Sequence, residues 1–384
     1  MTLFSFYATC PKGLEAPLED ELTSLGFKDT LKGDAGVWFA GSFTDGMKAN
    51  LYSRIASRIL LLVKKDTYAN ERELYESAYS FAWSNWFEVN QTFMVTTNAK
   101  NCPLRSIDFV TLRIKDAICD HFRDIHEQRP SIDTRDPHVR IYVYLTDQEY
   151  FYYIDLSGEA LFKRGPRIES GDTPLKKNLV AGLLALSHWQ PGIPLVDMFC
   201  GSGTILIEAA EITLKRAPGL HRSFGFENLK LFDSSVWQKI VKEAESLAEK
   251  QRPLPIWGYD LKGDAIQSSL ANFKAADLDE TISLKQVNAI ESTPPTDKGM
   301  IISNPPYGVR LSDLSFLKEL YPQLGETLKK RYANWDGWFL TADLTFTKGL
   351  RLKPSRKIPL FNGALECRFF HIPLVPGSNR KKDA

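Results

Sequence analysis

The stretch Leu195–Ala210, LVDMFCGSGTILIEAA, decides the fold of the C-terminal half of the chain. An apolar run ends at Asp197, a glycine-containing turn follows, and a helical apolar pattern begins. This order predicts a buried strand, a tight turn and a helix, which is the building unit of doubly wound sheets. Gly201 and Gly203 permit backbone conformations and a close ligand approach that a side chain would prevent. The helix N-terminus offers unpaired N–H groups to a ligand.

The turn lacks two marks of a phosphate-binding loop. Position 206 is Leu, so the G-x-G-x-x-G pattern is incomplete, and the Lys of a P-loop is missing. The turn therefore predicts a ligand of adenosine type without a pyrophosphate. The alternative is a tight turn whose glycines are only structural. The residues that we expect to line this site are Asp197, Cys200, Gly201, Ser202, Gly203 and Thr204.

Polar residues also end the next two predicted strands. Asp260 follows the run IWGY, and an acidic residue there can accept hydrogen bonds from both ribose hydroxyls. It lies about sixty residues after the glycines, where about twenty is usual, because an insertion runs from about residue 214 to 255. A helix N-cap is the alternative role for Asp260, although Asp264 can fill it. Asn288 can meet an adenine edge, and the neighbouring Leu261 and Ala289 complete the expected cofactor contacts.

A third strand ends in Asn304-Pro305-Pro306-Tyr307, within IISNPPYGVRL. An amine attached to a conjugated ring is a poor nucleophile, because its lone pair is delocalised into the ring. The Asn304 side-chain oxygen and the Pro305 carbonyl can accept its two N–H bonds, and the prolines fix the backbone that holds them. Tyr307 can stack on a base that has left its helix. We expect rate to come from positioning the amine in line with an electrophilic methyl group.

These motifs all follow strands of one predicted parallel sheet. Strands alternate with helices from residue 174 to 384, and the last two strands read as an antiparallel hairpin at the sheet edge. The fold class is therefore α/β for this domain. Ligands of such sheets bind at the carboxyl ends of the strands, so we expect the motifs to converge there. Residues 1–65 and 66–157 read as two α+β segments, and 158–173 reads as a linker rich in Gly, Pro and charge.

Composition sets the class of protein. The chain has 384 residues, 43% of them hydrophobic, which is enough for more than one core. Its five cysteines are scattered without a C-x-x-C pair, so we expect neither a metal site nor disulfides. No apolar run is long enough for a membrane helix and no signal peptide is evident, so we expect a cytoplasmic protein.

Overall charge does not indicate a nucleic-acid partner. The 48 basic and 47 acidic residues leave a net charge of +1, so only a local basic surface could bind RNA. Solvated surface charge is the plainer interpretation of each basic stretch. The residues that we expect to contact RNA are Arg105, Arg113, Lys115, Lys163, Arg164 and Arg167.

The chain resembles a known family over nearly its whole length. VDMFCGSGT and SNPPYG are similar to the cofactor and target-amine motifs of class I S-adenosylmethionine-dependent amino-methyltransferases. TCPKGLEAPLEDEL, SRIASRILL, DLSGEALFKRGPR, KNLVAGLLALSHWQPGIPL and RAPGLHR resemble the bacterial guanine-N2 methyltransferases of large-subunit (23S) ribosomal RNA. The resemblance implies a Rossmann-like methyltransferase domain preceded by a ferredoxin-like segment and an RNA-binding THUMP domain.

The resemblance also implies roles for individual residues. S-adenosylmethionine would lie against Asp197, Gly201 and Gly203, with Asp260 on its ribose and Asn288 on its adenine. Asn288 departs from the acidic residue often found there. Asn304 to Tyr307 would hold the guanine amine, with Asn304 also beside the cofactor. Ribosomal RNA would be the partner, and we expect a monomer that needs no metal.

Several alternatives share these motifs. A transfer RNA guanine-N2 methyltransferase can carry both the THUMP domain and the tetrapeptide. An adenine-N6 nucleic-acid methylase or a protein glutamine methyltransferase fits the tetrapeptide, but an N-terminal RNA-binding region disfavours both. An RNA-binding assembly factor without activity is disfavoured because the glycines and the tetrapeptide are both intact.

Overall fold

The structure, a computed structural model, describes residues 2–165, 175–307 and 311–376, without the side chains of 311–315. Arg167 and the second half of the expected linker lie outside these ranges. The chain divides into two compact units, and each consists of three separate segments. The first unit comprises Met1–Cys10, Glu19–Leu161 and Gly219–Glu243, and the second comprises Pro11–Leu18, Phe162–Pro218 and Ala244–Ala384.

The first unit is built on a seven-stranded sheet in the order β2-β3-β1-β4-β7-β6-β5. Its neighbouring strands are antiparallel, except that β5 and β6 are parallel. The sheet is thus of the α+β kind that the sequence predicted. Its strands are β1 (Phe4–Thr9), β2 (Lys28–Gly33), β3 (Gly36–Gly41), β4 (Arg58–Thr67), β5 (Phe93–Ala99), β6 (Val139–Leu145) and β7 (Glu149–Asp155).

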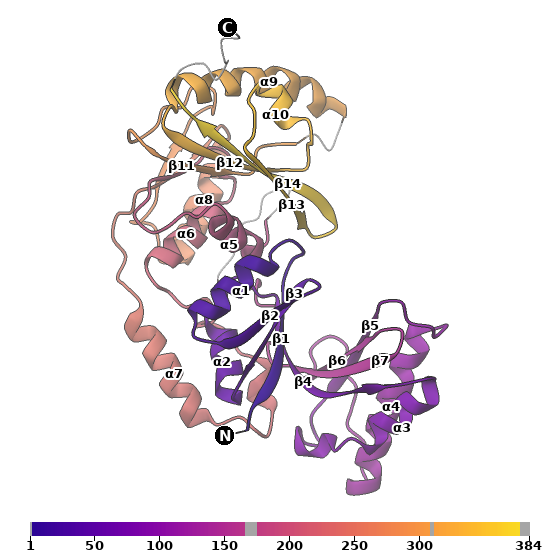
Figure 1. Cartoon of the computed structure of the whole chain (residues 1–384). Coiled ribbons are helices and arrows are strands. Elements are labelled where there is room, and N and C mark those ends of the chain that lie inside the picture. Colours follow the sequence, from indigo (N-terminus) through magenta and orange to yellow (C-terminus); the bar gives the residue numbers. More distant parts are fainter. Residues whose placement is uncertain (1, 166–174, 308–310, 377–384) are drawn as a thin grey trace. The chain divides into compact units, whose positions relative to one another are not determined.

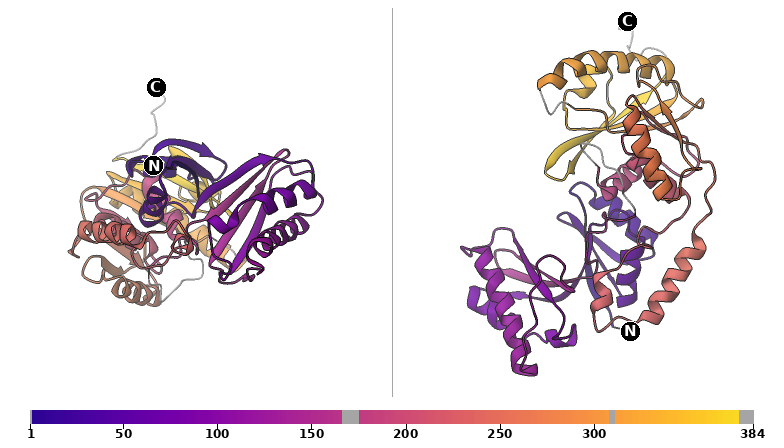
Figure 2. Two further views of the ribbon diagram at one scale, coloured as in Figure 1. Left: turned by 90° about the horizontal axis from the view of Figure 1, so that it is seen from below. Right: turned by 180° about the vertical axis from the view of Figure 1, so that it is seen from behind.

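Four helices from the N-terminal part of the chain belong wholly or partly to this unit. They are α1 (Glu15–Ser24), α2 (Phe43–Tyr52), α3 (Glu71–Ser80) and α4 (Ile107–His126). Helix α4 begins as predicted, because the Ser106 hydroxyl caps it by accepting the N–H of Phe109 at 3.2 Å. Its apolar face is buried, including Val110, Ile114 and Phe122. Figures 1 and 2 show α3 and α4 packed together beside β5–β7.

The segment Gly219–Glu243, from the predicted insertion, returns to the first unit. The N–H of Phe226 donates to the carbonyl of Leu156 at 3.0 Å. The Arg222 guanidinium donates to the carbonyls of Ser157, Glu159 and Ala160. This segment therefore satisfies the backbone carbonyls that follow β7. It contains the 3-10 turn Gly225–Asn228 and the start of α7 (Ser234–Leu247).

The second unit is built on another seven-stranded sheet, in the order β10-β9-β8-β11-β12-β14-β13. Strands β8 to β12 are parallel, and β14 is antiparallel to both of its neighbours. The expected hairpin at the sheet edge is confirmed. The strands are β8 (Leu195–Asp197), β9 (Ile256–Asp260), β10 (Ser283–Gln286), β11 (Gly299–Ser303), β12 (Trp335–Thr341), β13 (Arg356–Asn362) and β14 (Leu365–Leu374).

Helices cover both faces of this sheet. They are α5 (Lys177–Leu186), α6 (Thr204–Thr213), α8 (Gly263–Ala275), α9 (Leu311–Arg331) and α10 (Phe346–Gly349). Leu324 and Leu328 of α9 join a buried cluster that includes Tyr259 and Phe339. Gly258 precedes Tyr259 in β9 and so faces the opposite side of the sheet. Its missing side chain leaves room for Leu206 of α6, whose Cδ1 would lie 2.4 Å from an ideal Cβ at this position. The first five strands thus form a doubly wound sheet whose order reverses between β8 and β11.

Membrane insertion through helices finds no support in the described ranges, where every helix is too short or too polar to span a bilayer.

We predict that Gly325→Ala destabilises the second unit. An ideal Cβ at Gly325 in α9 would lie 2.0 Å from the carbonyl oxygen of Leu350, which is backbone and cannot turn away. Overpacking of this kind costs about 1–3 kcal/mol, although Gly→Ala within a helix otherwise stabilises. Chemical denaturation should show the loss. Gly263→Ala in α8 is the control, because its new Cβ would make only ordinary contacts, at 3.5 Å or more. Equal stability of the two variants would contradict the prediction.

Candidate active site

The predicted polar residues meet at the carboxyl edge of the second sheet. Asp197 is the last residue of β8, and Asp260 is the last residue of β9. Asn288 lies two residues after β10, and Asn304 directly follows β11. The strand order reverses between β8 and β11, which is where doubly wound sheets open a ligand crevice.

The glycine turn between β8 and α6 needs both glycines, for different reasons. Gly201 and Gly203 have φ values of +53° and +80°, in the left-handed region. A Cβ at Gly203 would lie 2.5 Å from Cε1 of Phe273, so this glycine permits close packing on α8. A Cβ at Gly201 would meet nothing within 4 Å. Gly201 therefore leaves open space beside the turn.

Two side chains of α8 donate hydrogen bonds to backbone carbonyls of the glycine turn. The Ser269 hydroxyl donates to the carbonyl of Gly201 at 2.8 Å, and the Asn272 amide donates to that of Ser202 at 3.0 Å. Both side chains are buried. The sequence reasoning missed them. Their spacing of three residues on one helix face is the signal that could have indicated them.

Asp260 fixes the other side of the turn. Its carboxylate accepts the N–H of Gly201 at 3.0 Å and that of Lys262 at 2.9 Å. A carboxylate has about four lone-pair positions, so acceptor capacity remains for a ligand's hydroxyl groups. The predicted ribose contact is therefore compatible with the fold.

Asp197 lies at the bottom of the site, with its side chain bonded to β11. Its Oδ1 accepts the Ser303 hydroxyl at 2.8 Å and the Phe199 N–H at 3.1 Å. The Ser303 hydroxyl in turn accepts the N–H of Met198 at 2.7 Å. Burial raises the pKa of Asp197 to about 7, against the lowering effect of these donors, and the charge of Asp260 adds to the rise. Ser303 was not among the predicted residues.

The tetrapeptide after β11 presents an unused acceptor. Asn304 Oδ1 is buried and has no hydrogen-bond partner among the described residues. An uncompensated buried acceptor costs about 1–3 kcal/mol, so the site fits a ligand that donates an N–H there. The Tyr321 hydroxyl of α9 donates to the carbonyl of Pro306 at 3.1 Å. Burial, and secondly the Asp343 carboxylate, raise the pKa of Tyr321, which keeps it a donor. Sequence reasoning missed Tyr321 too.

The remaining predicted cofactor residues have different environments. Asn288 Oδ1 accepts the N–H of Ile290 at 3.3 Å, so the side chain caps its own turn. Ala289 is buried, whereas Leu261 is 54% exposed and offers an apolar surface. Burial raises the pKa of the Cys200 thiol, whose Sγ lies 4.0 Å from the Ser269 hydroxyl. Thr204 begins α6. A cofactor contact with Cys200 would therefore involve its backbone.

The structure corrects one predicted RNA contact in the second unit. Arg164 is buried, and its guanidinium pairs with Glu208 of α6 at 2.7 Å. This buried ion pair attaches the segment that precedes α5 to helix α6. Lys163 is exposed, and Arg167 lies outside the described residues.

The predicted RNA contacts of the first unit remain on its surface. Arg105 is exposed. Arg113 lies over the ring of Tyr75 at 4.3 Å, and Lys115 pairs with Asp116 at 2.8 Å. Arg113 and Lys115 are thus partly engaged within the domain.

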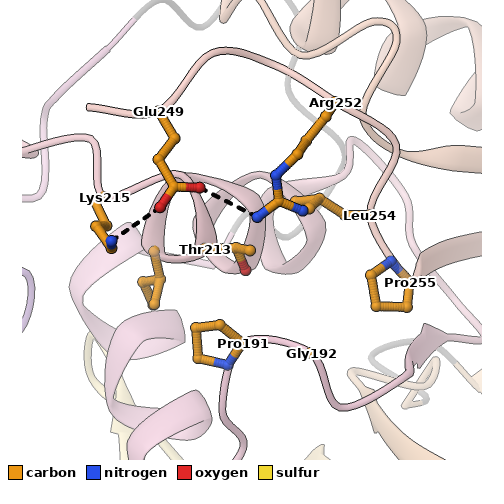
Figure 3. A pocket seen from close by; sticks show the side chains of 9 residues that line it. Pro191, Gly192, Thr213, Lys215, Glu249, Arg252, Leu254 and Pro255 are labelled. Carbon is orange, nitrogen blue, oxygen red and sulfur yellow. Dashed lines mark hydrogen bonds and ion pairs between the residues drawn. The ribbon is translucent and has the colours of Figure 1, made fainter. Parts of the chain in front are cut away.

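A pocket lies at the opposite edge of the second sheet, before β8 and β9 (Figure 3). Its volume is about 290 Å³. Glu249 lies between Lys215 and Arg252 and pairs with both, at 2.9 and 3.2 Å. The polar groups of this pocket therefore satisfy one another, which sets it apart from the carboxyl edge.

Three family profiles match the chain. Residues 5–60 match the RlmL ferredoxin-like domain, residues 68–155 match the THUMP domain, and residues 164–370 match the RMKL-like methyltransferase domain. The last match covers more than half of the chain.

Relatives match almost all of this chain. The "Ribosomal RNA large subunit methyltransferase K/L" of Shewanella baltica (strain OS185) is 38% identical over 99% of the chain and 54% of its own length. The chain therefore spans about half the length of the curated relatives it matches.

Solved structures match the whole chain. SMU.472, described as a candidate methyltransferase complexed with SAH, is 31% identical with a TM-score of 0.87, over 99% of this chain and 100% of that one. A chain from Listeria monocytogenes str. 4b F2365, described as a predicted N6-adenine-specific DNA methylase, is 29% identical with a TM-score of 0.88, over 98% and 97%.

We predict that Asp197→Asn removes a pH dependence of stability. The folded pKa of about 7 exceeds the unfolded value of about 3.9, so the folded state keeps a proton that the unfolded chain has released. This stability is fully present below about pH 4 and is lost toward about pH 7, by up to about 1.4 kcal/mol per pH unit.

Denaturant titrations of the wild type and the variant across this range provide the measurement. The free energy of unfolding of Asp197→Asn, relative to wild type, should rise from about pH 5 to 7 and then level off. Asp233→Asn is the control, because hydrogen bonds, first that from Ser235, lower the pKa of Asp233, and its effect belongs to more acidic pH. A flat difference for Asp197→Asn would contradict the raised pKa.

Proposed function

The chain belongs to the RMKL-like methyltransferase family, and from that premise we propose that it methylates the N2 amine of a guanine in large-subunit ribosomal RNA. S-adenosylmethionine is the proposed methyl donor. The observation that carries the proposal is the buried, unpartnered Oδ1 of Asn304 at the carboxyl end of β11. This atom is an acceptor placed beside a turn suited to an adenosine-type ligand.

The residues at this edge fit S-adenosylmethionine. Gly201 leaves open space, as a ligand without a pyrophosphate requires. Asp260 retains lone pairs for the ribose hydroxyls, and the exposed side chain of Leu261 can pack against the adenine beside Asn288. When bound, the cofactor supplies an electrophilic methyl group. The protein's part is to hold the amine and the donor in line.

The tetrapeptide supplies the amine-holding groups. Asn304 Oδ1 accepts one amine N–H and the Pro305 carbonyl accepts the other, which favours a more pyramidal nitrogen with an available lone pair. Neither Pro305 nor Pro306 has an N–H, so the segment cannot be fixed by its own backbone donors. Ser303 and Tyr321 fix it from either side. Tyr307, partly exposed, is placed to stack on the flipped base.

Ribosomal RNA is the substrate that the relatives favour. The relatives named for large-subunit ribosomal RNA align with 99% of the chain, and the THUMP and ferredoxin-like profiles cover its first part. We further propose that it acts as a monomer in the cytoplasm.

An adenine-N6 methylase is the second candidate, because the Listeria structure carries that description at 29% identity. The Asn304 acceptor suits an adenine amine as well. A transfer RNA guanine is the third. Neither alternative requires a change in the site geometry, so the substrate must be decided by experiment.

Transfer of a labelled methyl group to purified large-subunit ribosomal RNA, transfer RNA and DNA tests the proposal. Digestion to nucleosides then identifies the modified base. We expect N2-methylguanosine in the ribosomal RNA alone. Label confined to transfer RNA, N6-methyladenine in any substrate, or no label in RNA would overturn the proposal.

We predict that two substitutions in the site affect different steps, one the methyl transfer and the other cofactor binding. Asn304→Ala removes an acceptor used in the transition state, so kcat should fall by at least about a hundredfold while S-adenosylhomocysteine binding stays nearly intact. Asp260→Ala should weaken that binding by about 1–3 kcal/mol through the lost charge-assisted bonds. Calorimetry and steady-state kinetics provide the measurements. Turnover of Asn304→Ala at the wild-type rate would refute the amine-acceptor mechanism.

We predict that Tyr321→Phe lowers kcat by about ten- to hundredfold, because a misplaced reacting group costs rate steeply. The variant keeps the ring packing on Phe346 and loses the bond to Pro306 together with the interaction of the hydroxyl with Asp343. Tyr332→Phe is the matched control, since its buried hydroxyl bonds to Ser292 at 2.9 Å in the same core cluster. Both variants should melt at similar temperatures and bind the cofactor normally. Equal kcat in the two variants would show that Tyr321 has no positioning role.

A further inference from the structure

The segment from Lys348 to Lys357, KGLRLKPSRK, carries a concentration of unpaired positive charge in the second unit. It has five cations and no acidic residue. We call these residues the basic ridge, and all five are exposed: Lys348, Arg351, Lys353, Arg356 and Lys357. Within the described ranges, none of them forms an ion pair or a side-chain hydrogen bond. For comparison, Lys215, Arg252 and Lys329 are all paired with glutamates.

The backbone under the ridge is held firmly at both ends. At its start, a Cβ on Gly349 would lie 2.6 Å from Cδ2 of Tyr321, so α10 lies directly against α9 (Figure 1). At its end, Ser355 bonds to His371 of β14 through its N–H at 2.8 Å and through its hydroxyl at 2.6 Å. A fixed backbone with free cationic tips loses little entropy on binding.

The ridge begins next to the candidate active site. Gly349 packs on the ring of Tyr321, and the Tyr321 hydroxyl donates to the carbonyl of Pro306. The backbone of Gly349, which lies between Lys348 and Arg351 in the chain, is therefore linked to the tetrapeptide through a single side chain. The loop that leads into α10 also exposes Leu344 by 60%.

Among the described residues, the neighbouring carboxylates form no ion pair with the ridge and have other partners. Asp343 accepts the N–H and the hydroxyl of Thr345, each at 2.7 Å. Glu366 pairs with Arg368 at 2.7 Å, and Asp336 is bonded to His371 at 2.9 Å. Because the whole chain has a net charge of only +1, the local excess is a property of this segment.

Arg351 has a φ of +54°, two residues beyond the end of α10, in a conformation that asparagine adopts readily.

We propose that the basic ridge binds the phosphates of the RNA strand next to the target base and so guides that base to Asn304. This inference rests on the proposed function. The five residue-to-residue steps from Arg351 to Arg356 span at most about 17 Å when extended, which is enough to follow several phosphates of a strand spaced about 3.4 Å apart along a duplex axis. The contacts are with the backbone, so they position the strand and do not read its sequence.

The test compares two variants that remove the same charge from different segments of the second unit. The ridge variant is Lys348→Gln with Arg351→Asn and Lys353→Gln, where Asn suits the left-handed backbone. The control is Lys250→Gln with Lys274→Gln and Lys298→Gln. These three lysines are exposed in segments that lead into β9, β10 and β11. Both variants keep every residue that we assign to the cofactor and the amine.

RNA binding to the full chain is measured against salt concentration, with large-subunit ribosomal RNA and with an oligouridine strand as probes. The slope of log K against log salt should decrease in magnitude by about 2 in the ridge variant, since each lost phosphate contact removes about 0.7–0.9. KM for RNA should rise, with kcat at saturating RNA and S-adenosylhomocysteine affinity unchanged. The control should match the wild type. Arg356→Gln with Lys357→Gln provides a second ridge variant if the first is unstable.

Equal slopes in the ridge and control variants would overturn the proposal, as would a loss of binding to anionic vesicles with RNA binding unchanged. Failure of the proposed function would look different. The wild type would then transfer no methyl group to ribosomal RNA, while the two variants would still differ in their salt dependence.

Discussion

The Ser303 hydroxyl makes the bond on which the second unit's site depends. It donates to Asp197 at the end of β8 and accepts the N–H of Met198. Ser303 ends β11, the neighbour of β8 at the point where the strand order of the sheet reverses. The loops that follow β8 and β11 therefore diverge next to this bond. The glycine turn leaves from one strand and the tetrapeptide from the other. One buried hydroxyl therefore fixes the separation between the glycine turn and the tetrapeptide, to which we assign the cofactor and the amine.

The rest of the site is secured by groups from helices on both faces of the sheet. Ser269 and Asn272 of α8 hold the glycine turn through its carbonyls, and Tyr321 of α9 holds the carbonyl of Pro306. In each case a side-chain donor satisfies a backbone carbonyl of the loop. The two loops are thus held by packed helices, and α9 contributes to a buried core cluster.

Sequence reasoning reached the features that are local in the chain. The strand, glycine turn and helix around Asp197, and the polar residues at four strand ends, follow from short patterns with known geometry. The anchoring residues did not, because their partners are distant: Ser269 and Gly201 are 68 residues apart, and Ser303 and Asp197 are 106 apart. Arg164 shows the same limit. Its charged neighbours suggested a surface, while its partner Glu208, 44 residues later, places it in the interior.

The return of residues 219–243 to the first unit has a consequence for synthesis. The carbonyls that follow β7 obtain their hydrogen-bond donors only when Arg222 and Phe226 have been synthesised. All seven strands of the first sheet lie within the first 155 residues, but the carbonyls that follow β7 gain these donors only after a segment beyond the glycine turn has been made. Domains usually fold as units in order of synthesis, whereas this unit is completed by a segment that is made late. A fragment that ends at the linker would lack the residues that donate to these carbonyls.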